Sequence, residues 1–369
     1  MTDPRGGYLE QIRQGGVALS PELAAAFASV PREAFVPDGF QRRDGGWVRP
    51  TDPDFLATVY RDDVLITKVD GKVPISSSSQ PSLMAIMIMA LDVTPGMRIL
   101  EIGAGTGYNA ALLASLGAKI ISIDVQEDVA DRARAALARA GIAGVRVEHT
   151  DGYAGVPGDR FDRVIVTVGV GGVSPLWLEQ LDPGGFVVAP VKHAGTHPVL
   201  AVAGPPGGPV TATVICSSGF MQAAGPLSAD HPGAFPDPVT TGALEELTVF
   251  APARFDPPLP EDAYRDLWYA SGAWNRRTTH ATVSSASSRE QNCLALLDDT
   301  RAGGAVLLPD GSVLAGGEKA PDYAAAAVEV LDRWLDAGRP PLRAWRITLT
   351  RTGDPAAPIW VPDRWELYR

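Results

Sequence analysis

The sequence predicts an α/β protein in which a doubly wound parallel sheet is joined to a smaller α+β domain. Between residues 81 and 225, short β-branched runs alternate with helical segments, and this order builds a parallel sheet covered on both faces. After a proline-rich stretch, residues 263–369 contain six of the eight tryptophans, which is enough aromatic surface for a separate core. The chain of 369 residues is long enough for two or three domains.

The first 80 residues are expected to form an N-terminal helical and substrate-loop region. Apolar side chains recur at helical spacing over residues 8–37, and Ser20 is placed as an N-cap before Pro21. Residues 38–80 are rich in Gly, Asp and Ser, which predicts irregular structure with one short strand at 64–69.

Regular alternation predicts the elements of the core, residues 81–225. Strands are expected at residues 98–102, 119–123, 145–148, 161–168, 186–191 and 199–203. Helices are expected at residues 81–91, 108–116, 127–140 and 175–181, and a turn at 182–185. Residues 226–262 hold eight prolines and predict a Pro-rich linker, and residues 263–369 predict a C-terminal accessory domain.

Composition excludes several classes of function. With 32 basic against 43 acidic residues and no long basic run, a nucleic-acid backbone or an anionic membrane is not expected as the main partner. Cys216 and Cys293 are too few for a disulfide scaffold or a thiolate metal site. His193 and His197 lie in a predicted loop without a nearby carboxylate or thiolate, so no metal is expected. The absence of an apolar leader or membrane-length segment predicts a cytoplasmic protein.

The sharpest local motif is the glycine-rich segment 100–109, Leu-Glu-Ile-Gly-Ala-Gly-Thr-Gly-Tyr-Asn, between a predicted strand and a predicted helix. Glycines there let the backbone press against a ligand. Gly105 and Gly107 are only two positions apart, which departs from the dinucleotide fingerprint, and Glu101 suits a cationic or zwitterionic ligand better than two phosphates. A turn without ligand and a nicotinamide or flavin nucleotide site remain the alternatives.

The pattern E-x-G-x-G-x-G resembles the first motif of class I S-adenosylmethionine-dependent methyltransferases. The resemblance implies their Rossmann-like fold, with S-adenosyl-L-methionine as cofactor and S-adenosyl-L-homocysteine as product. Asp124 ends the next strand, where a carboxylate can accept from both ribose hydroxyls, and Asp151 can accept from the adenine amino group. The implied cofactor-binding residues are Glu101, Gly103, Ala104, Gly105, Thr106, Gly107, Asn109, Asp124, Val125, Asp151 and Gly152.

Further motifs in order resemble the protein-L-isoaspartate O-methyltransferase family over about residues 8–225. They are Val30–Pro37, Tyr60–Asp63, Ser79–Pro81, Pro95–Gly103 and Leu181–Gly185. The resemblance implies ester-forming methyl transfer to an aspartyl-type carboxylate. Ser77 and Ser79 match the family's Thr-x-Ser and are the candidate catalytic residues, with Ser76, Ser78 and Gln80 as substrate-binding candidates. The alternative is a flexible polar loop in which Ser79 caps the helix at Pro81.

The serine run, segment 108–113, the degraded closing motif at 220–225 and the Trp-rich tail resemble one actinobacterial branch. That branch modifies aspartate in ribosomally synthesised, post-translationally modified peptides of the lanthipeptide or graspetide type. It implies a macrocyclised peptide substrate whose aspartyl ester collapses to an aspartimide and then hydrolyses to isoaspartate. Trp274, Arg276 and Arg277 are substrate-binding candidates in the tail, against the alternative of an ordinary core with solvated charges.

Three other functions remain open at this stage. The first is an isoaspartyl repair methyltransferase with an appended domain. The second is a non-catalytic peptide-binding protein, and the third is a nicotinamide-dependent oxidoreductase. The sequence predicts no oligomeric state.

Overall fold

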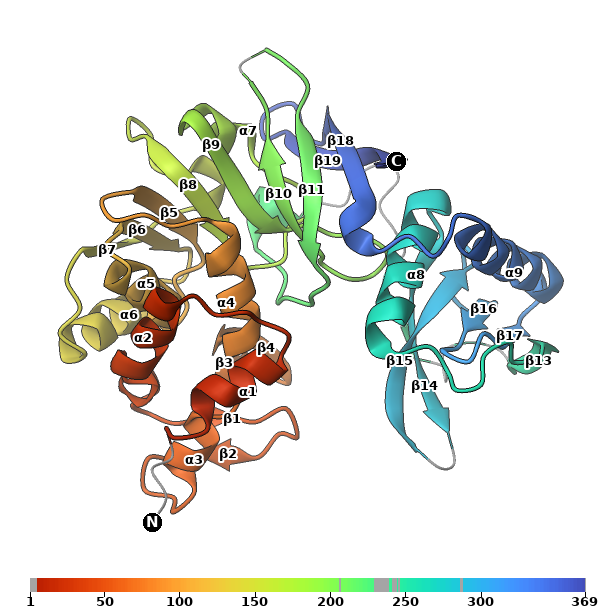
Figure 1. Cartoon of the computed structure of the whole chain (residues 1–369), viewed down its shortest axis with the longest axis horizontal. Helices are drawn as coiled ribbons and strands as arrows, with labels where there is room; N and C mark the ends of the chain where they lie inside the picture. Colours follow the sequence, from red (N-terminus) through yellow and green to blue (C-terminus); the bar gives the residue numbers. More distant parts are fainter. Residues whose placement is uncertain are drawn as a thin grey trace. The chain divides into compact units, whose positions relative to one another are not determined.

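A computed structural model of the chain describes residues 5–205, 207–228, 239–240, 244, 246–285 and 288–368 (Figure 1). The chain divides into two compact units, each with its own elements. Unit 1 comprises residues 1–190, 199–210 and 220–228, and unit 2 comprises residues 191–198, 211–219 and 229–369. This division differs from the predicted boundary near residue 225, because two short segments of the predicted core belong to unit 2.

The predicted helical stretch 8–37 is three separate elements of unit 1. They are the helices α1 (Tyr8–Gln14) and α2 (Pro21–Ser29) and the 3₁₀ helix η1 (Arg32–Phe35). Gly16 at φ +86° interrupts the first helix, since this left-handed conformation favours glycine. Ser20 is confirmed as the N-cap of α2, where its hydroxyl accepts the amide of Leu23 at 3.2 Å.

The prediction of irregular structure over residues 38–80 is wrong, whereas the single strand predicted at 64–69 is confirmed within one residue. The segment folds into a four-stranded antiparallel sheet of order β2-β1-β3-β4 and a short helix. The elements are β1 (Phe40–Gln41), β2 (Trp47–Val48), α3 (Phe55–Val59), β3 (Leu65–Asp70) and β4 (Val73–Ser78). Three serines of the serine run are therefore in a strand rather than a flexible loop. Serine has low strand propensity, and pairing with the apolar strand β3 outweighs that local preference.

The main sheet of unit 1 confirms the doubly wound prediction. Its order is β10-β9-β8-β5-β6-β7, with β5 to β9 parallel and β10 antiparallel to β9. The strands are β5 (Arg98–Ile102), β6 (Lys119–Asp124), β7 (Val145–His149), β8 (Phe161–Val166), β9 (Leu181–Pro190) and β10 (Val199–Ala203). The helices are α4 (Pro81–Ala90), α5 (Tyr108–Ser115), α6 (Glu127–Arg139) and α7 (Pro175–Glu179).

One strand boundary of the main sheet was predicted incorrectly. The segment 182–185 is a bulge inside β9 rather than a turn before it, because the register against β8 shifts between Phe161 and Arg163. The other strands and helices from residue 81 to 203 lie within two residues of their predicted ends. Strand order reverses between β5 and β8, which is the switch point where ligands bind in doubly wound sheets.

Unit 2 contains a six-stranded sheet of order β12-β14-β15-β16-β17-β13 and a three-stranded set of order β19-β18-β11. The strands are β11 (Thr211–Cys216), β12 (Val239–Thr240), β13 (Thr248–Ala251), β14 (Thr278–Ser285), β15 (Ser288–Leu297), β16 (Gly304–Leu307), β17 (Val313–Gly316), β18 (Trp345–Thr352) and β19 (Ile359–Leu367). The helices are α8 (Glu261–Trp274) and α9 (Ala320–Asp336), and α9 contacts β16 and β17.

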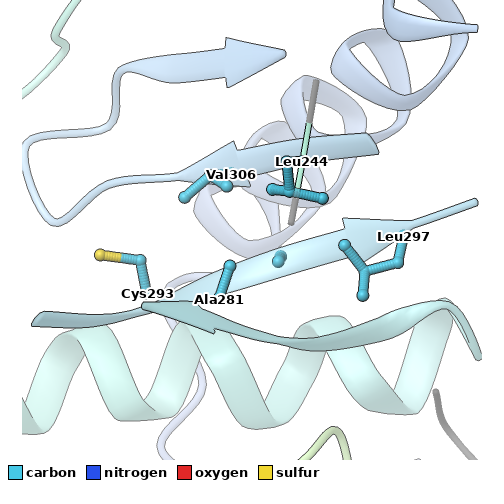
Figure 2. Packing of buried hydrophobic residues seen from close by; sticks show 6 residues of the cluster. Leu244, Ala281, Cys293, Leu297 and Val306 are labelled. Atoms are coloured by element: carbon cyan, nitrogen blue, oxygen red, sulfur yellow. The ribbon is translucent and has the colours of Figure 1, made fainter. Parts of the chain in front are cut away.

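Within the predicted linker 226–262, β12 and β13 are strands of the six-stranded sheet. Residues 229–238, 241–243 and 245 of that stretch lie outside the described residues. Figure 2 shows Leu244 packed in a core cluster with Ala281, Cys293, Leu297 and Val306. Trp334 and Trp345 are fully buried, which confirms that the tryptophan-rich tail builds a core. No helix in the described parts of the chain is long and apolar enough to cross a membrane.

Candidate functional site

The glycine loop follows β5 at the switch point of the main sheet. Gly103, Gly105 and Gly107 all have positive φ, at +97°, +52° and +84°, and Gly107 stands directly before α5. A Cβ on Gly103 would lie 2.8 Å from the hydroxyl of Thr167, which donates to the Gly103 carbonyl at 2.6 Å. Thr167 follows β8, so the loop is held from the neighbouring strand across the switch point.

Asp124 joins the glycine loop to the loop after β6. One carboxylate oxygen accepts the amide of Gly105 at 3.1 Å, and the other accepts the amide of Gln126 at 3.0 Å. Burial raises the pKa of Asp124 above its ordinary value. A carboxylate has about four acceptor sites, so each oxygen keeps a lone pair for a ligand. The neighbouring Val125 exposes half of its apolar side chain.

Glu101 and Asn109 support the glycine loop from the interior. The Glu101 carboxylate is fully buried and accepts hydrogen bonds from Asn109 Nδ2 at 2.7 Å and from the Ser122 hydroxyl. Burial raises the pKa of Glu101 to about 7, although both hydrogen bonds act to lower it. Because these bonds link β5 to β6 and to the first turn of α5, we assign Glu101 and Asn109 to positioning the loop.

Asp151 and Gly152 form the turn after β7. Asp151 is exposed and its carboxylate accepts the amide of Tyr153 at 2.9 Å, which caps a short 3₁₀ helix, η2 (Gly152–Ala154). A Cβ on Gly152 would lie 2.7 Å from Ile102, the last residue of β5. The turn therefore packs against the strand that leads into the glycine loop, and its contact with the cofactor stays a prediction.

The serine strand β4 passes close to the glycine loop. The Ser77 carbonyl oxygen lies 3.0 Å from the position that a Cβ on Gly105 would occupy. Ser76 and Ser78 are 8% and 2% exposed, whereas Ser77 and Ser79 are half-buried. Side chains alternate along a strand, so Ser76 and Ser78 are buried in the interior, and their contact with substrate stays a prediction. The structure thus brings Ser77 to the predicted cofactor loop.

The N-terminus of α4 is organised by Asp62, which the sequence analysis did not select. Its carboxylate accepts the Ser82 amide at 2.7 Å and the Gln80 side-chain amide at 3.0 Å. Gln80 occupies the N-cap position, so the alternative in which Ser79 caps this helix is wrong. The side chain of Gln80, a substrate-binding candidate, is bonded to Asp62 and to the Ser82 hydroxyl at 3.0 Å. The only sequence signal for Asp62 was its place in the motif Tyr60–Asp63.

Arg32 is a second residue that the sequence analysis used only as a family marker. Its guanidinium is fully buried and donates to four backbone carbonyls, those of Val59 (2.8 Å), Arg61 (2.9 Å), Asp63 (2.9 Å) and Ser79 (3.0 Å). A buried charge is tolerated when hydrogen bonds replace water. Arg32 therefore fixes the backbone of Ser79 against the segment that carries Asp62.

The substrate-binding candidates of the tail lie in unit 2. Trp274 contacts the ring of Trp345 and stacks beneath the guanidinium of Arg333. Arg276 pairs with Asp363 at 3.4 Å, and Arg277 pairs with Asp299 at 2.6 Å. Each of these side chains already has a partner within unit 2, and their contact with substrate stays a prediction.

The two histidines of segment 193–197 serve packing. His193 is buried and its Nε2 lies 2.9 Å from the Tyr269 carbonyl. Burial lowers the pKa of both His193 and His197 to about 4. In the described part of the chain, no three His, Cys, Asp or Glu side chains are grouped so that they could hold a metal ion.

The chain is similar in sequence to the proteins of one known family. Residues 6–208 match the family model described as protein-L-isoaspartate(D-aspartate) O-methyltransferase. The protein-L-isoaspartate O-methyltransferase of Thermotoga maritima is 38% identical over 178 residues, which are 47% of this chain and 51% of the relative. That of Methanoculleus marisnigri is 36% identical over 185 residues, 49% of this chain and 73% of the relative. The match thus spans about half the length of the Thermotoga relative.

A solved structure extends the similarity beyond the matched segment. It is named protein-L-isoaspartate O-methyltransferase and aligns with 98% of this chain and 99% of its own, at a TM-score of 0.53 and 24% identity. At that identity the likeness concerns the fold alone.

Proposed function

This chain belongs to the protein-L-isoaspartate O-methyltransferase family, and on that premise we propose that it methylates isoaspartyl carboxylates in peptides. Unit 1 has the class I methyltransferase fold, and the family is one of S-adenosyl-L-methionine-dependent carboxyl O-methyltransferases. The observation that carries the proposal is the approach of the Ser77 backbone to Gly105, which sets a hydroxyl-bearing strand beside the cofactor loop.

The residues of the glycine loop fit S-adenosyl-L-methionine, which supplies a methyl group on a positively charged sulfur. A Cβ on Gly103 or Gly105 would meet Thr167 or Ser77 at 3.0 Å or less, so only glycines allow this close backbone course. The free lone pairs of Asp124 suit the ribose hydroxyls, and the exposed face of Val125 suits the adenine ring. Ala104, Thr106 and Gly107 complete the loop that would hold the amino-acid end.

The hydroxyls of Ser77 and Ser79 would orient the accepting carboxylate. An aspartyl carboxyl group has a reference pKa of about 3.9, so it is ionised at neutral pH and needs no general base. Neutral hydroxyl donors hold a carboxylate without withdrawing as much charge as an arginine pair would. Pairing of β4 with β3 positions Ser77, and the contact of Arg32 with the Ser79 carbonyl positions Ser79. These residues thereby supply orientation rather than acid–base chemistry.

Intact mass spectrometry tests this proposal. The enzyme and S-adenosyl-L-methionine are incubated with matched linear peptides that contain aspartate or isoaspartate at one position. We expect a gain of about 14 Da, the mass of a methyl ester, on the isoaspartyl peptide. No gain on that peptide, while calorimetry shows that cofactor binds, would contradict the proposed substrate. Absence of cofactor binding would favour the non-catalytic alternative, and titration with NADH tests the oxidoreductase.

A second candidate substrate is an unmodified aspartate in a macrocyclised ribosomal peptide. The four-serine run Ser76–Ser79, where the family has Thr-x-Ser, and the degraded segment 220–225 support it. Adding a macrocyclic peptide to the same incubation distinguishes the two substrates. A gain of about 14 Da that decays to a loss of about 18 Da on the macrocycle alone would replace the isoaspartyl proposal with this one.

A further inference from the structure

We propose that Gln126 is a positioning residue that couples the cofactor site to the strand carrying Ser77. The proposal concerns the contacts that link the predicted cofactor site to the predicted peptide-binding site. It rests on the proposed function, which identifies the two ligands as S-adenosyl-L-methionine and a peptide. The contacts that form the path are all within unit 1.

Gln126 makes three hydrogen bonds at the start of α6. Its backbone amide donates to the Asp124 carboxylate at 3.0 Å. Its side-chain Nε2 donates to the carbonyl of Ile75 in β4 at 3.0 Å, and its Oε1 accepts from Lys68 Nζ in β3 at 2.8 Å. One half-buried side chain therefore connects the predicted ribose-binding carboxylate with both strands of the β3–β4 hairpin.

Lys68 adds a second connection between the hairpin and α6. Its ammonium group contacts the Asp128 carboxylate at 2.7 Å in addition to Gln126. Lys68 pairs with Ser76 in the strand register, one residue before Ser77. The attachment is therefore made close to the candidate catalytic serine rather than at the far end of the hairpin.

Three hydrogen bonds and one close approach, that of the Ser77 carbonyl to the Cβ position of Gly105, link these residues in a ring. The ring runs from Gln126 to Ile75, along β4 to Ser77, across to Gly105, and through Asp124 back to Gln126. Asp124 and Gly105 are both members of the ring, so a ligand that contacts either one acts on the ring. Coupling between sites is reciprocal, so placement of β4 must in turn affect cofactor affinity.

The test compares Gln126→Met with the matched variant Gln41→Met. Methionine has nearly the length and volume of glutamine but makes neither of the two side-chain hydrogen bonds. The backbone amide of residue 126 can still donate to Asp124. Gln41 lies in β1, in the four-stranded sheet that also contains β3 and β4. Its side-chain amide donates to the Gly45 carbonyl at 3.1 Å, and it takes no part in the ring. Gln126→Met loses one neutral side-chain hydrogen bond, to Ile75, and one from the Lys68 ammonium group. Hydrogen-bond energies of this order predict that S-adenosyl-L-methionine binds about two- to tenfold more weakly to Gln126→Met, as measured by calorimetry.

Amide hydrogen exchange supplies a readout that does not depend on turnover. In the wild-type protein, S-adenosyl-L-methionine should slow exchange in residues 73–78, and Gln126→Met should lose most of that slowing while Gln41→Met keeps it. Gln126→Glu retains an acceptor for Lys68 but lacks the donor to Ile75, so it should also lose the slowing. With peptide substrate, Gln126→Met should lower kcat through Ser77 and raise the peptide KM less.

Two outcomes would overturn the inference. One is cofactor-dependent slowing of β4 that is the same in Gln126→Met as in the wild type. The other is an equal loss in Gln41→Met, which would reduce the effect to general stability of the sheet. In both cases methylation by the wild-type enzyme stands, so failure of the coupling is separable from failure of the proposed function. A wild-type protein that binds no S-adenosyl-L-methionine would overturn both.

Discussion

The two units of this chain bury their side chains in different ways. In unit 1, the buried arginine and the buried glutamate of the described residues, Arg32 and Glu101, lie beside the serine strand and the glycine loop. In unit 2, Trp334 and Trp345 are buried, and Arg276 and Arg277 form exposed ion pairs. Burying a charged side chain costs free energy, whereas packing an aromatic side chain does not. Buried ionisable side chains are therefore concentrated at functional sites. The comparison therefore supports the proposal that the reaction takes place in unit 1.

The largest expected effect is that of Gly105→Val. The residue has φ +52°, where a β-branched side chain is strained, and its Cβ would press on the Ser77 carbonyl. We expect S-adenosyl-L-methionine affinity to fall by more than about 100-fold in calorimetry, since both strain and loss of ligand space act together. Gly141→Val is the control, because Gly141 also has positive φ, +68°, but has open space around its Cβ position. Equal affinity loss in both variants would contradict the ligand-facing assignment.

The charge of Glu101 predicts a pH dependence of stability. Its pKa in the folded protein is about 7, raised from 4.5. Its contribution to the free energy of unfolding is therefore fully present below pH 4.5 and is lost as the pH rises to about 7. This loss is on the order of 3 kcal/mol in the free energy of unfolding. Glu101→Gln should remove that component. Urea unfolding at pH 5 and pH 7.5 measures it, and an unchanged difference between the two pH values in the variant would contradict the assignment.

Removal of the candidate orienting hydroxyls should have an intermediate effect. Ser77→Ala and Ser79→Ala should each lower kcat by about tenfold and leave cofactor affinity unchanged, because one hydrogen bond to the reacting carboxylate is lost. Ser115→Ala, which removes a hydroxyl bonded to the Ala111 carbonyl of α5, is the control. Steady-state kinetics with the isoaspartyl peptide as substrate measures the effect. Unchanged kinetics in both site variants would leave the serines only a structural role.

The smallest expected effect is that of the paired arginines of unit 2. Arg276→Ala with Arg277→Ala should change the peptide KM by less than about threefold, because exposed ion pairs contribute little. A KM that rises more than tenfold, with cofactor affinity unchanged, would show that unit 2 reads the substrate. That result would restore the role predicted for these residues from the sequence and weaken the contrast between the two units.

Much of the fold was predictable from local pattern. The parallel strands and helices from residue 81 to 203 were predictable because buried β-branched runs and helical periodicity are properties of neighbouring residues. The glycine loop and Asp124 were predictable from spacing along one strand–helix unit. Of the four-stranded sheet of residues 40–78, only β3 was predictable, because the other strands are short or serine-rich and are stabilised by pairing across the sheet.

The candidate site was predictable only in part for the same reason. Neither the role of Asp62 at α4 nor that of Arg32 at Ser79 follows from any local spacing, since their partners are 18 to 47 positions away. Gln126 likewise meets Ile75 across 51 positions.

The sequence by itself determined the doubly wound core, the family and the glycine loop, because each is encoded in contiguous residues whose conformation is a local property. The tertiary structure decided that the Ser77 backbone approaches the glycine loop and that Ser76 and Ser78 are buried. It also decided that Glu101 is buried behind the loop and that Arg276 and Arg277 are paired. Burial and pairing are set by contacts between distant segments, and a side chain's chemistry depends on those contacts as much as on its identity.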